Sequence, residues 1–458
     1  MIQVGLQSQD VLAWTSGHAR GTLPAAFSAV STDSRESMAG ALFVALRGER
    51  FDGHAFLPAA RAAGAAAALV QRGTAPPADL PTVEVDDTLR ALGAMGHGHR
   101  RRFQPALLGV TGSVGKTSTK ELLAAALSPL GPVLKTEGNL NNEVGVPLTL
   151  LRLGASHAAA VIEMGMNHLG EIARLAAIAE PRVGIVTNVR GVHLETLGTV
   201  ERVAEAKGEL YRGLPEGGVA IANADDPLAL AQARASGRLL VTFGRGAADV
   251  QLLSARQGLE GVEIRVRAAG AAYEGRVPFL GDHNALNACA ALAAAQVCGV
   301  AIDRAIAGLA EARPAPHRLA LVQLSDDVVL LDDCYNANPH STGAALDTLR
   351  ALGAGRRLGA LLGDMLELGP DELELHRRVG AAAHGLTWIY AFGPRALALA
   401  EGARGAGVPA VAHGTDVEQG LAWVRSQLRP GDLVLLKGSR GMRMERFGEA
   451  LGAPAGGH

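Results

Sequence analysis

A glycine-rich segment in the first third of the chain most constrains what the chain can fold into. Residues 109–119 read Gly-Val-Thr-Gly-Ser-Val-Gly-Lys-Thr-Ser-Thr; an apolar run, Ala106–Thr111, leads into them and a helical pattern, Lys120–Leu127, follows. Glycines in such a loop let backbone N–H groups approach phosphate oxygens, and the dipole of the following helix adds to the attraction. A strand, a glycine turn and a helix in this order predict a nucleotide phosphate cradle in an α/β domain.

The residue types of this loop indicate what each member does. The Lys116 ammonium would reach the outer phosphates, and the Thr117 hydroxyl would hold Mg²⁺. Val110 stands where the common GxxxxGK[ST] pattern has its first glycine, so a chance glycine turn is the alternative, which the flanking strand and helix disfavour. The predicted ATP-binding residues of the loop are Gly112, Ser113, Gly115, Lys116, Thr117 and Ser118.

The length of the chain requires more than one hydrophobic core. At 458 residues it exceeds the size at which a single core stops growing. The basic cluster Arg100–Arg102 and the prolines at 314 and 316 mark two boundaries. We predict an α/β protein with a small N-terminal α/β domain (1–103), a central P-loop-type parallel-sheet ATPase domain (104–314) and a C-terminal Rossmann-like α/β domain (315–458).

Apolar runs bounded by turn residues predict the strands of these domains. The alternation of strands and helices predicts parallel sheets, and no GxGxxG fingerprint accompanies the C-terminal one. In the N-terminal domain we expect a strand near 41–46 and an alanine-rich helix over 56–70. The other predicted strands are 106–111, 158–163, 183–188, 328–333, 357–363, 387–392 and 432–437, with helices at 371–380 and 416–428.

Composition and charge narrow the cellular setting. A net charge of −2 gives no overall basic field for a nucleic acid. The three cysteines form no CxxC pair and the N-terminus shows no export signal, so reduced thiols in a cytoplasmic protein are expected. The uncharged run Ala285–Ile302 contains two amides and a glycine, which favours a buried helix over a membrane span.

Lysine is rare in this chain. Only five of the 43 basic residues are lysine, namely Lys116, Lys120, Lys135, Lys207 and Lys437. A guanidinium cannot replace a compact ammonium or a nucleophilic amine. Each lysine therefore raises a functional question.

Three residues of the central domain could form a cation site. Glu163 ends a predicted parallel strand, at the edge where such sheets bind ligands. His193 follows the strand that ends near Asn188, and Lys207 lies on a helix that begins near Thr199. A loop histidine and a helical lysine are more often ordinary solvated residues, so neither is persuasive alone.

Three groups of polar residues could supply further contacts. The Asn-rich loop 139–147 could bind phosphate or substrate, although such loops are mostly turn chemistry. Asn284 and Asn287 lie one helical turn apart. They could bind a base or a phosphate, or they could be an N-cap and a buried amide. Arg318 follows the predicted domain junction, from which it could swing onto a γ-phosphate when the domains close.

Taken together these motifs resemble those of the Mur ligases, a family of ATP-dependent amide ligases. Within the family the resemblance is to the branch that adds D-alanyl-D-alanine (D-Ala-D-Ala) to UDP-N-acetylmuramoyl-tripeptide (UDP-MurNAc-tripeptide) in peptidoglycan precursor synthesis. Besides the phosphate loop, the resemblance lies in residues 31–35, 40–48, 52–54, 332–341, 362–369 and 436–445.

The resemblance implies three domains, the cofactors ATP and Mg²⁺, and roles for individual residues. Ser34 and Arg35 would contact the UDP end of the substrate. Thr117 and Glu163 would hold one Mg²⁺, and His193 with a carbamate on Lys207 would hold a second. Lys116, Lys207, His193 and Arg318 would be catalytic, and Asn284, Asn287, Arg318 and Asp333 would bind ATP.

The amine substrate is expected at the C-terminal domain. A dipeptide zwitterion needs a cation for its carboxylate and acceptors near its amine. Loops after two predicted strands place suitable residues at one sheet edge, although exposed loop cations and turn asparagines are the alternative reading. The predicted amine-site residues are Asn336, Asn338, Lys437, Ser439 and Arg440.

Other functions are less well supported by the sequence. The tripeptide-forming Mur ligases carry a DNPR segment that this chain lacks, and folylpolyglutamate synthases share the cradle without the N-terminal motifs. A GTPase-like switch would bring an NKxD motif, yet no lysine here follows an asparagine. If the chain bound nucleotide without catalysing a reaction, the presence of a lysine at position 207 would have no explanation. We therefore expect a monomeric ligase that acts on small molecules, without a nucleic-acid partner or a membrane span.

Overall fold

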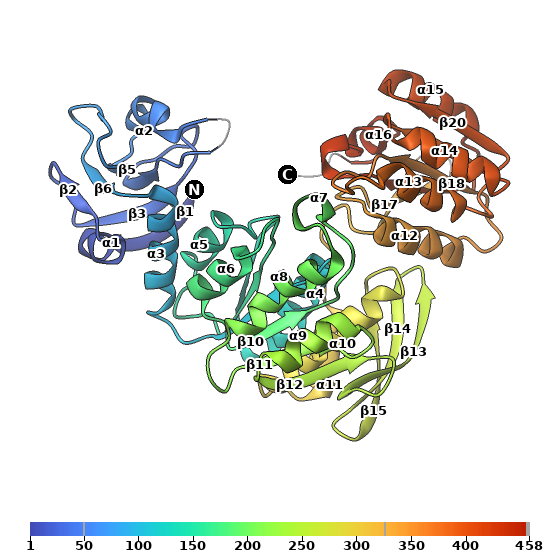
Figure 1. Cartoon of the computed structure of the whole chain (residues 1–458), viewed down its shortest axis with the longest axis horizontal. Coiled ribbons are helices and arrows are strands. Elements are labelled where there is room, and N and C mark those ends of the chain that lie inside the picture. The colour runs from blue at the N-terminus through green and yellow to red at the C-terminus, as the bar shows by residue number, and fades with distance from the viewer. Residues whose placement is uncertain (49–50, 325–326, 455–458) are drawn as a thin grey trace.

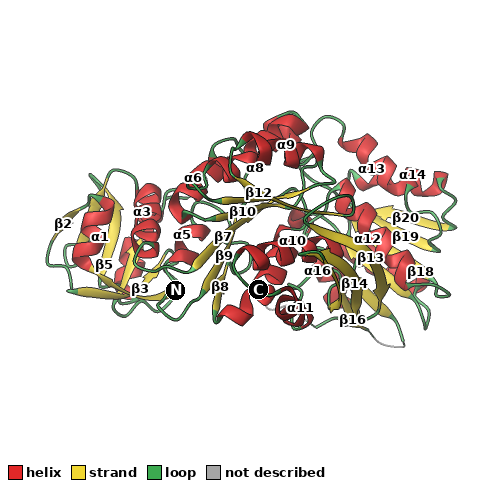
Figure 2. Cartoon of the chain, turned by 90° about the horizontal axis from the view of Figure 1, so that it is seen from below, coloured by secondary structure: helices red, strands yellow, loops and turns green. Residues whose placement is uncertain are grey.

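Three β-sheets follow one another along the chain, and helices cover each of them. The computed structural model describes residues 1–48, 51–324 and 327–454. Both views place the N-terminal and C-terminal sheets toward opposite ends of the long axis, with the central sheet between them (Figures 1 and 2). The predicted α/β class with three sheet-based units is confirmed.

The N-terminal sheet has six strands in the order β1-β3-β4-β5-β6-β2. Strands β3 to β6 pair in parallel, and β1 and β2 flank them antiparallel. Its strands are β1 (Ile2–Gln7), β2 (His18–Arg20), β3 (Ala26–Ser31), β4 (Ala41–Val44), β5 (Ala67–Gln71) and β6 (Thr82–Val85), with helices α1 (Ser8–Thr15), α2 (Leu57–Ala62) and α3 (Thr88–Arg100).

The long helix predicted over 56–70 is wrong in its second half. Helix α2 ends at Ala62, and Gly64 then takes a φ of +96°, which breaks the helix. Residues 67–71 form β5, whose first four side chains are buried. Alanines fit a helix or a tightly packed strand equally well. Here residues 67–70 of β5 are buried and paired with neighbouring strands, which favours the strand.

The central sheet has nine strands in the order β15-β14-β13-β12-β11-β10-β7-β9-β8. In this order, the seven strands from β13 to β8 pair in parallel with one another. The first three strands, β15, β14 and β13, pair antiparallel. The strands are β7 (Ala106–Thr111), β8 (Val133–Lys135), β9 (Ala159–Glu163), β10 (Val183–Val186), β11 (Val219–Asn223), β12 (Leu239–Gly244), β13 (Val250–Gly258), β14 (Gly261–Ala268) and β15 (Ala271–Val277).

Two hydrophobic cores flank this sheet. One contains apolar residues of α4 (Lys116–Leu127), α10 (His283–Val297) and α11 (Ile302–Ala310). The other contains residues of α5 (Gly145–Leu150), α6 (Glu171–Ala179), α8 (Val200–Arg212) and α9 (Pro227–Ala235). Figure 2 shows α6, α8 and α9 on one side of the sheet and α10 and α11 on the other. The run 285–302, predicted as one buried helix, is divided after α10. No helix of the described residues is long and apolar enough to cross a membrane.

The C-terminal sheet has six strands in the order β16-β17-β21-β18-β19-β20, parallel except for β16. The strands are β16 (Ala320–Gln323), β17 (Val329–Asp332), β18 (Leu358–Gly363), β19 (Trp388–Phe392), β20 (Ala410–Gly414) and β21 (Leu433–Lys437). The helices are α12 (Pro339–Leu352), α13 (Glu372–Ala381), α14 (Ala396–Gly405), α15 (Val417–Gln427) and α16 (Glu445–Ala450). The predicted boundaries after residues 103 and 314 fall between consecutive sheets and stay predictions.

Candidate active site

A cleft of about 530 Å³ lies where the central sheet faces the C-terminal one. Its walls come from loops after the carboxyl ends of β7, β9 and β10 and of β17 and β21, the edges at which parallel sheets bind ligands. Residues of three predicted groups share this one cavity: the phosphate loop, the cation site and the C-terminal loops. Its lining includes Ser113, Lys116, Thr117, Glu163, His193, Asn284, Asn287, Arg318, Asp333, Asn336, Asn338, Lys437 and Arg440.

The phosphate loop has the backbone that its glycines permit. Gly112 has a φ of +154°, and a Cβ there would lie 1.9 Å from the Thr187 hydroxyl. Gly115 has a φ of +84°, and its Cβ would lie 2.9 Å from the Asn287 amide oxygen. Helix α4 begins at Lys116, so its unpaired N–H groups point at the cleft. The loop is therefore shaped to receive an anion.

Lys116 folds back across this loop. Its Nζ donates a hydrogen bond of 2.8 Å to the Gly112 carbonyl oxygen. Burial lowers the pKa of this ammonium, whereas the Glu163 carboxylate opposes that shift. An anion bound in the cleft would stabilise the charged form of Lys116 and so offset the cost of its burial.

The end of β10 holds the phosphate loop in place. The Asn188 side chain accepts from the Val114 N–H (3.0 Å) and donates to the Val114 carbonyl (2.9 Å). The Ser113 hydroxyl donates to the Arg190 carbonyl (3.1 Å), and the Arg190 guanidinium pairs with buried Asp226 (2.6 Å). Two neighbouring strand ends thus form one rigid unit.

Glu163 has the surroundings of a cation ligand. Its buried carboxylate accepts from the Asn141 amide through Oε1 (2.8 Å), while Oε2 has no hydrogen-bond partner among the described residues. An unpaired buried carboxylate oxygen is costly unless a cation or water meets it. Thr117 lines the same cavity. These residues fit a magnesium ion.

The Asn-rich loop combines both predicted roles. Asn142 makes turn hydrogen bonds to the N–H groups of Val144 (3.2 Å) and Gly145 (2.9 Å). Asn139, Asn141 and Asn142 all line the cleft. Asn142 therefore shapes the loop and lines the site at once.

The remaining members of the predicted cation site differ in their surroundings. Lys207 is buried on α8, and burial, with nearby Lys116 adding repulsion, holds its pKa well below the ordinary value. A neutral amine is the form that reacts with CO₂. His193 lies at the N-terminus of α7 (Leu194–Leu197) with a φ of +54°, and its Nδ1 lies 3.0 Å from Glu367 Oε2 of the C-terminal unit.

Not every lysine serves the cleft. Lys120 and Lys135 both pair with Glu121 on α4, and neither lines the cleft. Their ion pairs with Glu121 set these two apart from Lys116 and Lys437, which line the cavity.

Helix α10 presents its two asparagines to the cleft. Asn287 donates to the Asn284 side chain (2.8 Å), which in turn donates to the Leu280 carbonyl (2.6 Å). Both residues are buried, so this face of the helix is a fixed polar wall beside the phosphate loop.

Arg318 and Asp333 enter from the C-terminal unit. The Arg318 guanidinium lies 4.2 Å from the centre of the Tyr335 ring, a cation–π contact that aims it across the cleft. Asp333 pairs with the buried ammonium of Lys437. Lys437 also donates to the Asn336 carbonyl (2.9 Å) and the Asp333 carbonyl (3.3 Å).

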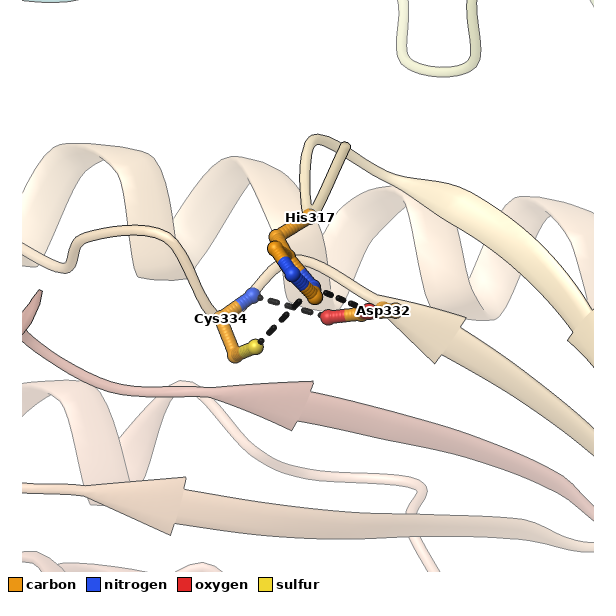
Figure 3. Close-up of side chains that lie close together, drawn as sticks. All are labelled: His317, Asp332 and Cys334. Carbon is orange, nitrogen blue, oxygen red and sulfur yellow. Dashed lines mark hydrogen bonds and ion pairs between the residues drawn. The ribbon is translucent and has the colours of Figure 1, made fainter. Parts of the chain in front are cut away.

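A hydrogen-bonded cluster fixes the linker next to Arg318. His317 has a φ of +59°, and its Nδ1 lies 2.7 Å from Asp332 Oδ2 and 3.6 Å from Cys334 Sγ (Figure 3). Its carbonyl accepts from the Tyr335 N–H (3.3 Å). The three side chains lie near enough to share a cation, yet their mutual hydrogen bonds already account for their proximity. Their effect is to anchor the segment that carries Arg318.

Comparison with known proteins agrees with this arrangement. The chain matches family models described as the Mur ligase middle domain (110–295), the Mur ligase glutamate ligase domain (317–440) and the Mur ligase family catalytic domain (26–100). The Escherichia coli (strain K12) protein named UDP-N-acetylmuramoyl-tripeptide--D-alanyl-D-alanine ligase is 39% identical, over 92% of this chain and 93% of that protein.

The chain belongs to the Mur ligase family. Among solved structures, MurF from Acinetobacter baumannii superposes with a TM-score of 0.91 at 32% identity, covering 98% of this chain and 99% of that one. MurF ligase from Thermotoga maritima in complex with ADP has a TM-score of 0.82 at 29% identity, covering 92% and 96%. The predicted family, fold and ligase class are confirmed.

Two predicted residues lie outside the cleft of this Mur ligase. Ser34 and Arg35 follow β3 in the N-terminal unit, and neither lines the cavity. The Arg35 guanidinium pairs with Asp33 at 2.6 Å and its side chain is 88% exposed. Their predicted contact with the UDP end of a substrate stays a prediction.

Several predicted amine-site residues are engaged within the C-terminal unit. Asn338 caps α12 by accepting from the Ser341 N–H (2.9 Å). The buried Ser439 hydroxyl donates to the Ala337 carbonyl (3.2 Å) and accepts from the Leu366 N–H (2.9 Å). Asn336 is exposed, and Arg440 lines the cleft with its side chain 48% exposed.

Sequence analysis missed Asn188, Arg190, Tyr335 and Glu367 as residues of the site. Asn188 ends a predicted strand and Arg190 follows it, which was a usable signal. Tyr335 and Glu367 lie inside motifs that carried the family resemblance but received no roles of their own. The structure assigns them positions against Arg318 and His193.

Proposed function

We propose that this Mur ligase uses ATP to join D-Ala-D-Ala to the carboxylate of UDP-MurNAc-tripeptide, in peptidoglycan precursor synthesis. The observation that carries the proposal is the 39% identity to the E. coli enzyme of that name, which spans more than nine-tenths of both chains. The cleft supports it, because the phosphate cradle, Glu163, His193 and the C-terminal loops line one cavity, although buried Lys207 is not among its lining residues.

The chemistry explains why these parts must meet. A carboxylate is a poor acyl donor because its leaving group would be oxide. Transfer of the γ-phosphoryl group of ATP to a carboxylate oxygen gives an acyl phosphate and ADP. The amine then attacks the acyl carbon, the C–O bond to phosphate breaks, and the nitrogen loses its proton as the amide and phosphate form.

Side chains from two units would bind the reacting phosphate. Lys116 lies within the phosphate loop, and Arg318 approaches from the C-terminal unit. Positioned cations stabilise the charge on a transferring phosphoryl group. Gly112, Ser113, Gly115, Thr117 and Ser118 would bind the other phosphate oxygens, Asn284 and Asn287 the adenine side, and Asp333 the ribose.

The cation ligands are carried over from the family resemblance. Thr117 and Glu163 would hold one magnesium ion, and His193 with a carbamate on Lys207 would hold a second. Bound magnesium would supply positive charge that offsets repulsion between the phosphates and the substrate carboxylate. Glu163 supports this role through its unpaired Oε2, and Lys207 through burial that favours the neutral amine.

We divide the predicted amine-site residues into two groups. Lys437 is buried and donates to Asp333 and two carbonyl groups, so we revise its role from carboxylate binding to positioning of this loop. Arg440 is the better placed cation for the dipeptide carboxylate, with Asn336 beside it, while Asn338 and Ser439 hold the loops. Ser34 and Arg35 would bind the UDP end in an N-terminal domain of residues 1–103. We propose a monomer that acts in the cytoplasm.

Phosphate release tests the proposed reaction. ATP hydrolysis to ADP and phosphate should require both UDP-MurNAc-tripeptide and D-Ala-D-Ala, with one amide product per phosphate. Release that is independent of the dipeptide, or that requires glutamate in its place, would contradict the proposal.

The first prediction separates Lys116 from Arg318. Lys116→Ala should lower kcat by roughly 100- to 1000-fold, the loss typical of removing one donor to a developing anion, and should weaken ATP binding. Arg318→Ala should slow phosphoryl transfer while the Kd for ATP stays within about threefold, because Arg318 completes the site only when the units close. Equal collapse of ATP affinity in both variants would place Arg318 in a fixed pocket.

The second prediction concerns a carbamate on Lys207. Enzyme incubated with ¹³C-bicarbonate should show a carbamate signal by ¹³C NMR that is absent in Lys207→Ala. Lys207→Ala should be inactive and partly regain activity with a small carboxylic acid, because an added carboxylate restores an oxygen ligand. Lys207→Arg should stay inactive, and full activity in that variant would rule the carbamate out.

The third prediction concerns Arg440. Arg440→Ala should raise the KM for D-Ala-D-Ala by about 10-fold, the loss expected for one charge-assisted hydrogen bond, with the KM for ATP little changed. Lys437→Ala should instead lower thermal stability, because it leaves the Asp333 carboxylate unpaired. An unchanged dipeptide KM in Arg440→Ala would place the carboxylate site elsewhere.

A further inference from the structure

A second, smaller cavity opens beside the phosphate loop. It measures about 160 Å³ and shares Ser113, Lys116, His193 and Arg440 with the larger cleft, so the two are adjacent. Its outer wall is formed by three C-terminal loops, among them the segment 366–368. The position suits an acceptor that must reach a carboxyl group activated at Lys116.

The charges around this cavity are unequal. Lys116 and Arg440 are cationic, and Glu367 is the one carboxylate among its described lining residues. Anionic substrate groups would go to the two cations. A bound ammonium group would find its counter-charge at Glu367 alone.

The carboxylates of the larger cleft have other partners or other proposed roles. Glu163 accepts from Asn141 through Oε1 and would use its unpaired Oε2 for a magnesium ion, and Asp333 pairs with Lys437. Glu171 accepts from the Asn167 N–H (2.7 Å) and lies 3.0 Å from the His168 ring. Glu367 makes a single hydrogen bond within the described part of the chain, through Oε2 to His193. Its Oε1 is therefore available to a ligand.

The backbone holds Glu367 toward the cavity. Its φ of +63° is uncommon for a residue with a side chain. The preceding residues are fixed, since Met365 N–H donates to the buried His376 ring (2.9 Å) and Leu366 N–H to the Ser439 hydroxyl (2.9 Å). Strain of this kind persists where the surrounding structure imposes it, and it clusters at ligand-binding sites.

We propose that the Glu367 carboxylate binds the ammonium group of the dipeptide and so makes a free amino terminus a requirement for binding. The inference rests on the proposed function. Arg440 and Glu367 line the same cavity, so together they would bind both ends of a zwitterion and place its nitrogen near the acyl phosphate. The ammonium group would give one proton to solvent water before the free amine attacks the acyl carbon. Glu367 is thereby a specificity-determining residue of the reaction.

Kinetics of Glu367→Gln test this role. The amide keeps the size of the side chain and removes the charge, so the KM for D-Ala-D-Ala should rise by about 10- to 100-fold, as expected for a lost hydrogen bond to a charged group. The KM values for ATP and UDP-MurNAc-tripeptide should stay within about twofold. Glu374→Gln, an exposed carboxylate on α13 paired with Arg377, is the matched control and should behave as wild type.

A ligand without the ammonium group shows whether Glu367 recognises charge on the dipeptide or only joins the two units through its contact with His193. Propionyl-D-alanine has hydrogen in place of that group. Calorimetry with a non-hydrolysable ATP analogue should show that wild type binds D-Ala-D-Ala at least about 10-fold more tightly than propionyl-D-alanine, and that Glu367→Gln has lost this preference. Unchanged binding of the ATP analogue confirms that the variant is folded.

Three results would overturn the inference. Glu367→Gln could retain the preference for the free amine, it could raise all three KM values together, or it could lower kcat alone. The last two would show that Glu367 acts through His193 or through the contact between units. A wild-type enzyme that released no phosphate with the dipeptide would contradict the proposed function itself, and the two failures are thereby distinguished.

Discussion

Repulsion between anions is the physical constraint on which the cleft depends. The terminal phosphate of ATP and a substrate carboxylate must approach to bonding distance, and two unit charges 4 Å apart repel by about 4 kcal/mol at an effective dielectric constant of 20. The chain surrounds that point with positive charge and N–H groups, from Lys116 at the start of α4 to Arg318 and Arg440 beyond the domain junction. The glycine φ values and the paired sheet edges serve that requirement, and the buried carboxylate Glu163 would serve it by holding a magnesium ion.

Neither unit contains the complete site. The central sheet supplies the phosphate loop, Glu163 and His193, whereas Arg318, Asp333 and Glu367 come from the C-terminal unit. The contact between His193 and Glu367 joins residues 174 positions apart in the chain. Closure of the two units would therefore assemble the catalytic arrangement and exclude water from an acyl phosphate, which is prone to hydrolysis.

Local patterns predicted much of the framework. The strand 106–111 and the helix after it follow from an apolar run and a glycine turn, and the structure has them within a few residues. The helix predicted over 56–70 failed because alanine alone does not distinguish a helix from a buried strand; Gly64 and the pairing of β5 with β4 and β6 decide the outcome. Pairings such as Lys437 with Asp333, which lie 104 residues apart, depend on how strands align in the sheet. A local sequence pattern therefore cannot predict them. For that reason a lysine predicted to bind substrate proved to be buried within its own unit.

An isotope transfer measurement tests the acyl phosphate at the centre of this mechanism most directly. UDP-MurNAc-tripeptide labelled with ¹⁸O in its reacting carboxylate should be turned over with ATP and D-Ala-D-Ala, and the phosphate analysed by mass spectrometry. If the carboxylate accepts the γ-phosphoryl group, each released phosphate should carry one ¹⁸O atom from the peptide. Unlabelled phosphate, with the amide product formed, would show that the carboxylate is never phosphorylated and would contradict the proposed use of the cleft.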